Sequence, residues 1–66
     1  MNNKIRVARA EVRMTQQQLA EAAGVSRQTI NAIESGKFVP STVLAIKMAQ
    51  IFGKSVEEIF QLEDGD

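Results

Sequence analysis

The chain has 66 residues, no cysteine and no histidine, and eight basic side chains that balance eight acidic ones. This length suits one domain, and the missing residue types exclude disulfides, thiolate metal sites and histidine-based catalysis. No apolar run approaches the roughly 20 residues of a membrane-spanning helix, and the polar start MNNKIRVARAEVR is unlike a signal peptide. A cytoplasmic protein without cofactor, metal or membrane contact is therefore expected.

The first predicted helix runs from about Lys4 to Arg13. Its apolar residues recur at spacings of three and four, the repeat of a helix with one buried face: Ile5, Ala8 and Val12. Arg6 and Arg13 lie off this stripe, where they can reach phosphate groups.

Residues 15–36, TQQQLAEAAGVSRQTINAIESG, predict two short helices joined by a tight turn. Thr15 begins a capping box, and Gly24 ends the first helix because glycine adopts the left-handed conformation that helix ends require. Ser26 caps a second helix from Arg27 to about Ser35. This order is the helix-turn-helix pattern, whose second helix can lie in a DNA major groove.

The outward side of that second helix carries Arg27, Gln28 and Asn31 once its isoleucines turn inward. Arginine can bond bidentately to guanine, and glutamine or asparagine to adenine, while residues near the helix start lie closest to the base edges. Ala32, one turn further in, is placed to touch a thymine methyl. The alternative interpretation is a solvated polar face, which the preceding turn and the nearby basic residues make less favourable.

Beyond a loop at residues 38–40, Ser41 caps a helix that runs to about Phe52, and Ser55 opens a short helix over Val56 to Phe60. The polar end QLEDGD is expected to fray, which leaves an ordered core of about residues 4–61 in a single domain. The predicted core consists of Ile5, Ala8, Val12, Leu19, Ala23, Val25, Ile30, Ile33, Leu44, Met48, Ile51, Phe52, Val56, Ile59 and Phe60.

The neutral total hides a charge split. Residues 1–37 carry six basic and three acidic side chains, whereas residues 38–66 carry two basic and five acidic ones. Such asymmetry can turn a basic face toward phosphate and an acidic end away from it, although the acidic end also fits a solubilising tail.

The stretch TQQQLAEAAGVSRQTINAIESGK resembles the Cro and cI repressor type of helix-turn-helix, also called the Xre family. The matching residues are Gln16, Leu19, Ala20, Gly24, Val25, Ser26, Ile30, Ile33, Glu34, Gly36 and Lys37, with Arg9 before them and Pro40 after them. The resemblance covers about residues 5–60 and implies an all-α, five-helix lambda-repressor-like domain. One departure is Arg13, which stands where the link between the first two helices often carries a glycine.

The resemblance also implies an ion pair between Arg9 and Glu34, for which we expect partial burial. Removing one partner of a buried pair costs about 3–5 kcal/mol, whereas an exposed pair contributes roughly 0–1 kcal/mol. Contacts to the DNA backbone are expected from Arg6, Arg13, Gln16, Ser26, Thr29 and Lys37. For Lys37 a solvated loop lysine remains the alternative.

These observations predict a sequence-specific regulator of transcription, a repressor, that binds a palindromic operator in double-stranded DNA as a homodimer. Candidate dimer surfaces are Phe38, Val39, Val43 and residues 60–62. The alternative is a protein-interaction module on the same fold, such as an antitoxin or a coactivator adaptor. An enzyme is not expected, because histidine, cysteine and a glycine-rich phosphate loop are all missing, and no small-molecule effector is evident.

Overall fold

The computed structural model describes residues 1–66 and contains five helices and a two-stranded antiparallel ribbon. The helices are α1 (Ile5–Val12), α2 (Gln16–Ala23), α3 (Arg27–Glu34), α4 (Thr42–Phe52) and α5 (Val56–Ile59), and the strands are β1 (Asn2–Asn3) and β2 (Phe60–Gln61). None of the helices combines the length and hydrophobicity needed to cross a bilayer. The predicted all-α, five-helix class is confirmed, with the ribbon as an addition.

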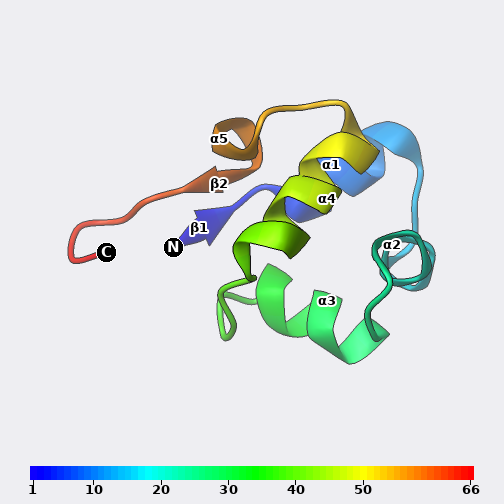
Figure 1. The fold of residues 1–66 in the computed structure, drawn as a ribbon, viewed down its shortest axis with the longest axis horizontal. Helices are drawn as coiled ribbons and strands as arrows, with labels where there is room; N and C mark the ends of the chain where they lie inside the picture. Colours follow the sequence, from blue (N-terminus) through cyan, green and yellow to red (C-terminus); the bar gives the residue numbers. More distant parts are fainter.

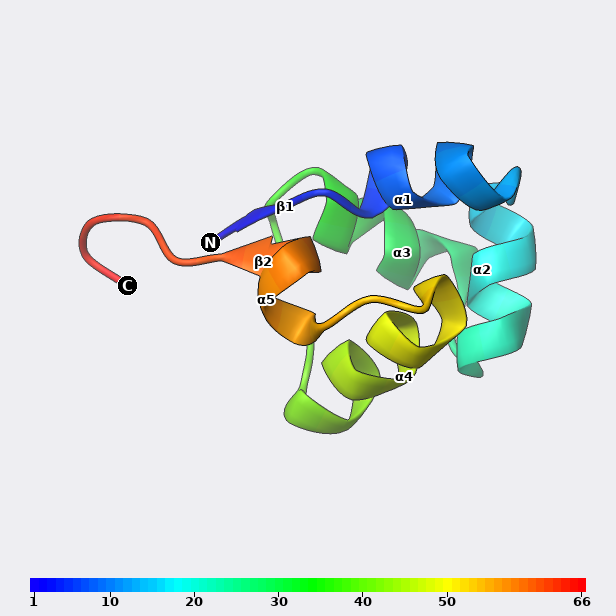
Figure 2. The same ribbon diagram turned by 90° about the horizontal axis from the view of Figure 1, so that it is seen from above.

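Helix α3 occupies one side of the molecule, with α2 next to its start and α4 above it in Figure 1. Seen from above, α1 and α4 flank the molecule on opposite sides, and the two chain ends project beyond the helices (Figure 2). Helix α2 packs against both α3 and α4, so the helix-turn-helix unit is anchored to the rest of the bundle.

Hydroxyl side chains set the start of four helices, as the sequence predicts. Thr15, Ser26, Ser41 and Ser55 each accept a hydrogen bond from the backbone N–H three residues later. Such caps satisfy N–H groups that have no partner inside the helix. The predicted end of α5 is one residue too late, because Phe60 leaves the helix to enter β2.

The buried residues are all apolar and form one cluster: Ile5, Ala8, Leu19, Ala20, Ala23, Ile30, Ile33, Leu44, Met48, Ala49, Phe52, Ile59 and Phe60. Three predicted core residues, Val25, Ile51 and Val56, are only half-buried at its edge. The prediction for Val12 is wrong, since it is 43% exposed. It is the last residue of α1, directly before the left-handed C-cap residue Arg13, and only Ile5 and Ala8 of this helix are buried.

The ribbon that joins the two ends of the chain was not predicted. Asn2 pairs with Gln61 and Asn3 with Phe60, and the Lys4 N–H donates to the Ile59 carbonyl at 2.7 Å. Order therefore begins before residue 4, and Gln61 belongs to β2 rather than to a frayed end. The antiparallel pairing satisfies backbone groups that two polar termini would otherwise leave to water.

Candidate nucleic-acid interface

The outward face of α3 gathers the residues for which base contacts were predicted. Ile30 and Ile33 are 0% and 1% exposed, and this inward pair turns Arg27, Gln28 and Asn31 into solvent. These three side chains and Gln16 of α2 line one open hollow that contains no hydrophobic residue. Ala32, by contrast, is half-buried beside this face. The fold thus presents a compact set of hydrogen-bond donors and acceptors on the first two turns of α3.

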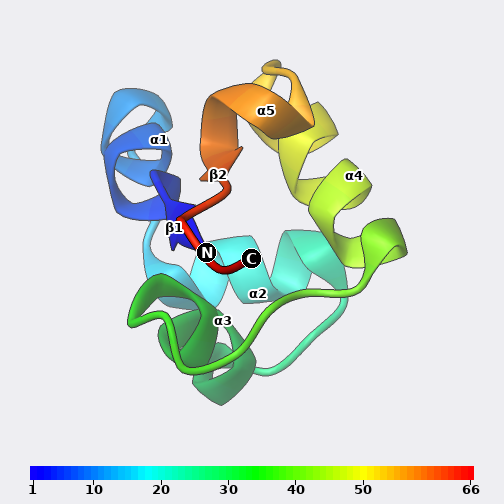
Figure 3. The ribbon, with the colours of Figure 1, turned by 90° about the vertical axis from the view of Figure 1, so that its left-hand side faces the viewer.

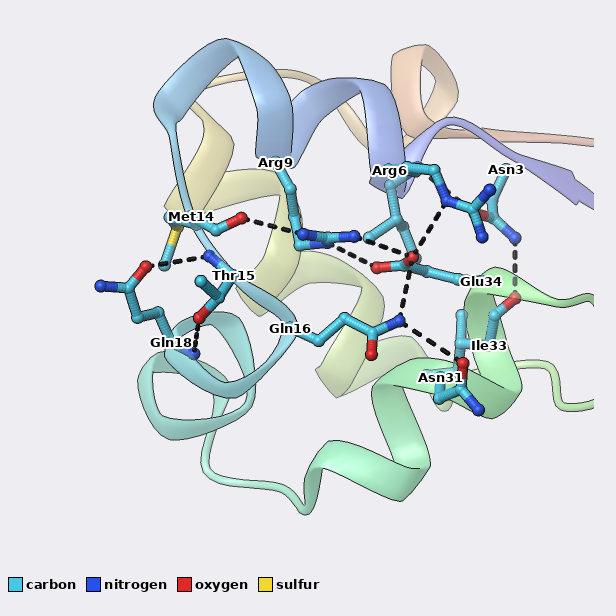
Figure 4. Close-up of polar contacts among 11 residues, drawn as sticks. Asn3, Arg6, Arg9, Met14, Thr15, Gln16, Gln18, Asn31, Ile33 and Glu34 are labelled. Carbon is cyan, nitrogen blue, oxygen red and sulfur yellow. Dashed lines mark hydrogen bonds and ion pairs between the residues drawn. The ribbon is translucent and has the colours of Figure 1, made fainter.

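Gln16 connects α2 to this face. Its Nε2 donates to Asn31 Oδ1 at 3.4 Å and to Glu34 Oε1 at 3.3 Å (Figure 4). Gln16 uses one of the two acceptor positions of Asn31 Oδ1, so the hydrogens of Asn31 Nδ2 and one acceptor position are left for partners in solution. Gln16 therefore orients a residue of α3 as well as standing at the start of α2.

Ser26 caps the start of α3, and its hydroxyl group forms a pair with the hydroxyl group of Thr29. Ser26 Oγ accepts the Thr29 N–H at 3.1 Å, and the two hydroxyl oxygens lie 3.0 Å apart. Two hydroxyl groups carry two hydrogens, and their mutual hydrogen bond uses one of them. The other hydrogen is available for an acceptor in solution at the start of α3.

Arg9 and Glu34 form an ion pair that ties α1 to α3. Arg9 Nε donates to Glu34 Oε2 at 2.7 Å and Nη2 donates to Oε1 at 3.1 Å, while Nη1 donates to the Met14 carbonyl at 2.9 Å. The side chains are 15% and 1% exposed and both residues are partly buried, which agrees with the expected partial burial. Arg6 Nε lies 3.6 Å from the same carboxylate but is 78% exposed.

This environment lowers the pKa of Glu34. Burial on its own raises the pKa of the carboxyl group, but hydrogen bonds from Arg9 and Gln16 and the charges of Arg9 and Arg6 outweigh it. Glu34 of α3 is therefore held as a carboxylate by side chains from α1 and α2.

Arg13 and Lys37 follow α1 and α3, in the α1–α2 link and the α3–α4 loop, which lie on opposite sides of the group of helices in Figure 1. Arg13 adopts the left-handed conformation with φ 58°, and it is the only residue other than glycine with a positive φ. Lys37 is exposed, and its N–H donates to the Ala32 carbonyl at 2.9 Å to close the end of α3. The segments that carry the two cations are thus not adjacent.

One contact to α3 was not predicted. Asn3 of β1 donates from Nδ2 to the carbonyl of Ile33 at 2.8 Å (Figure 4). Its Oδ1 accepts the Ile5 N–H at 3.3 Å, although the N-cap of α1 is Lys4, so the sequence carries no capping signal for either contact of Asn3.

Comparison with known proteins is consistent with this geometry. Residues 5–59 match a family model described as helix-turn-helix. The chain is 52% identical over 66 residues to an uncharacterized helix-turn-helix-type transcriptional regulator of Methanocaldococcus jannaschii, and the alignment covers all of both chains. It is 44% identical over 64 residues to another of Bacillus subtilis, covering 97% of each. Its fold is similar to the crystal structure of the restriction-modification controller protein C.AhdI from Aeromonas hydrophila, with a TM-score of 0.77, 27% identity and 85% of each chain covered.

Proposed function

Because the chain belongs to the Xre-type helix-turn-helix family of DNA-binding transcriptional regulators, we propose that it binds one specific operator through α3 and represses transcription there. The observation that carries this proposal is the polar hollow on α3, where Arg27, Gln28 and Asn31 meet Gln16. These are the side-chain types that read bases in the major groove. A cytoplasmic location follows from the same proposal, since the operator must be accessible.

In this proposal each residue of α3 has a separate contact. Arg27, at the start of the helix, donates to O6 and N7 of a guanine, and Gln28 bonds the edge of an adenine. Asn31 donates to a base acceptor through Nδ2, which makes no hydrogen bond within the protein, while Gln16 fixes the orientation of its amide. Ala32 lies at the edge of the site against a thymine methyl.

Contacts to phosphate then position the protein without reading sequence. The free hydroxyl hydrogen of the Ser26–Thr29 pair points to one such contact. Arg6 contributes a second, because Arg9 already neutralises Glu34 and leaves the exposed guanidinium of Arg6 as surplus charge. The full set proposed for the DNA backbone is Arg6, Arg13, Gln16, Ser26, Thr29 and Lys37.

We also propose that two copies of the chain bind together on a palindromic operator. Five large hydrophobic side chains of the α3–α4 loop, the first half of α4 and the residue after β2 are exposed. We call them the apolar patch: Phe38, Val39, Val43, Ile46 and Leu62, which are 45–79% exposed. Two of them, Val39 and Ile46, line an apolar hollow together with Met1, Pro40 and Phe60.

The position of the apolar patch supports a two-fold dimer. The α3–α4 loop passes beneath the two chain ends on the side that faces the viewer in Figure 3, and it directly follows the last residue of α3. A two-fold axis at this side brings the ends of two α3 helices toward each other and leaves their starts outward. Recognition helices related in this way suit half-sites about one helical turn apart.

Sedimentation measurements test the dimer. Val43→Glu, which places a charge in the patch, is expected to convert a wild-type dimer to a monomer. Gln50→Glu is the matched control, because it adds the same charge to an exposed position of α4 outside the patch. A wild-type monomer at all accessible concentrations, or equal effects of both substitutions, contradicts the assignment of this surface.

Selection of binding sites from random duplex DNA tests the function itself. We expect a palindromic motif that is bound roughly 10³-fold or more above random duplex, and repression of a reporter whose promoter carries the motif. Recovery of no motif, with only weak salt-dependent binding, would instead favour the protein-interaction module, for which the neutral net charge and the apolar patch are suitable.

A further inference from the structure

Helix α3 is held at its end by two side chains that precede it in the chain by many residues. Arg9 of α1 binds Glu34, and Asn3 of β1 donates to the carbonyl of the neighbouring residue, Ile33, at 2.8 Å. The Ile33 carbonyl lies in the last turn of α3, where carbonyl groups have no partner within the helix. It also accepts the Gly36 N–H at 3.0 Å, so Asn3 completes its two acceptor positions.

Both polar groups of the Asn3 amide are used, and they connect different elements. Oδ1 accepts from the N–H of Ile5 at the start of α1, while Nδ2 reaches across to α3 (Figure 4). Asn3 itself is fixed by its pairing with Phe60 in β2. Phe60 in turn lines the apolar hollow that Val39 and Ile46 of the apolar patch share.

We propose that Asn3 is a positioning residue for sequence reading, an inference that rests on the proposed function: its amide fixes the angle at which α3 meets the DNA. Hydrogen bonds to base edges require a constellation held within about 0.5 Å and 10–20°. Contacts to phosphate made by long, flexible side chains tolerate a larger displacement and carry no sequence information. Loss of the Asn3 contact therefore weakens binding to the operator while it leaves binding to random duplex nearly unchanged.

The test compares Asn3→Asp with Asn2→Asp. Asn3→Asp keeps the oxygen that accepts the Ile5 N–H, but it replaces the donor to Ile33 with a second oxygen. Asn2→Asp adds the same charge to the adjacent residue, which is exposed and whose side chain makes no hydrogen bond. Affinity is measured for the selected operator and for random duplex, at a temperature where melting curves show both variants to be folded.

We expect the ratio of operator to random-duplex affinity to fall about tenfold further in Asn3→Asp than in Asn2→Asp, the effect of losing one hydrogen bond. A purely structural role of Asn3 lowers the folded fraction, which reduces both affinities by one factor and leaves their ratio unchanged. Equal ratios in the two variants would therefore overturn the proposal.

Two further comparisons complete the design. If Asn3→Asp does not fold, Asn3→Ala and Asn2→Ala repeat the comparison without an added charge, and the same ratio decides. If the wild-type protein itself binds every duplex equally, the proposed function fails and the role of Asn3 fails with it. A wild-type preference for the operator combined with equal variant ratios refutes the role of Asn3 alone.

Discussion

Replacing Arg9 with alanine is expected to destabilise the fold severely, because it leaves the Glu34 carboxylate buried without its main partner. Breaking a buried ion pair by removal of one member costs about 3–5 kcal/mol. Glu34 keeps Gln16 at 3.3 Å and the exposed Arg6 at 3.6 Å, which places the expected cost near the lower end of that range. A chain of this length has a total stability of about 3–10 kcal/mol, so the loss is a large share of it.

Urea unfolding followed by circular dichroism measures this cost, and thermal melting gives a second readout. Each kcal/mol corresponds to about 4–8 °C in melting temperature for so small a domain, so a drop of at least about 12 °C is expected. Arg6→Ala is the matched control, since it removes an exposed cation from the same carboxylate and should cost no more than about 1 kcal/mol.

A double substitution separates the pair from its members. Replacing both residues with methionine removes the two charges together, and we expect it to be less damaging than Arg9→Ala alone because no charge remains buried. The reasoning is refuted if Arg9→Ala lies within about 1 kcal/mol of the wild type, or if Arg6→Ala is as damaging as Arg9→Ala.

Four further outcomes follow from the site. Arg27→Ala should weaken operator binding by about 1–3 kcal/mol and relax the preference at one base pair; an equal loss on random duplex in competition binding would contradict its role. Lys37→Ala should weaken all duplexes alike and reduce the slope of affinity against salt by about one unit, and a sequence-dependent loss would argue against a phosphate contact. Arg13→Gly should raise the melting temperature, because relief of the left-handed conformation, about 1–2 kcal/mol, exceeds the entropy cost of glycine, about 0.5–1 kcal/mol; an unchanged or lower value would refute this. Because the pKa of Glu34 is lowered by folding, the stability it contributes is complete above its ordinary value of 4.5 and is lost as the pH falls through the folded-state pKa; in acid titrations Glu34→Gln should lack this loss, and parallel titration curves would show that Glu34 contributes none of it.

Local signals in the sequence were sufficient for most of the fold. Hydroxyl caps such as Thr15 and Ser55, and glycines such as Gly24, act within one helical turn, so the helix boundaries were predicted to within about a residue. Val12 was misassigned because periodicity identifies the face of a helix but not how far its neighbours extend along it. The ribbon was missed because two strands of two residues each have no periodicity to detect.

The candidate site likewise contains residues whose positions follow from local spacing and contacts that do not. Arg27, Gln28 and Asn31 follow from the inward direction of two isoleucines on one helix, a relation that sequence spacing alone provides. The pairing of Arg9 with Glu34 was inferred only from resemblance to a family, since 25 residues separate the partners. The contact from Asn3 to Ile33 spans 30 residues and uses a backbone carbonyl, for which no residue type in the sequence is diagnostic.

On α3 the residues that pack in the core are different from those that face outward, and this separation affects how such proteins diverge. The only buried apolar side chains of α3 are Ile30 and Ile33, and the outward residues Arg27, Gln28 and Asn31 contribute nothing to the core. Substitutions of exposed residues usually change the free energy of unfolding by less than about 0.5 kcal/mol. With base reading assigned to Arg27 and Gln28 as proposed, duplicated genes could acquire new operators by substitution at these two positions without passing through unfolded intermediates, and mutually orthogonal regulators could be built on one scaffold.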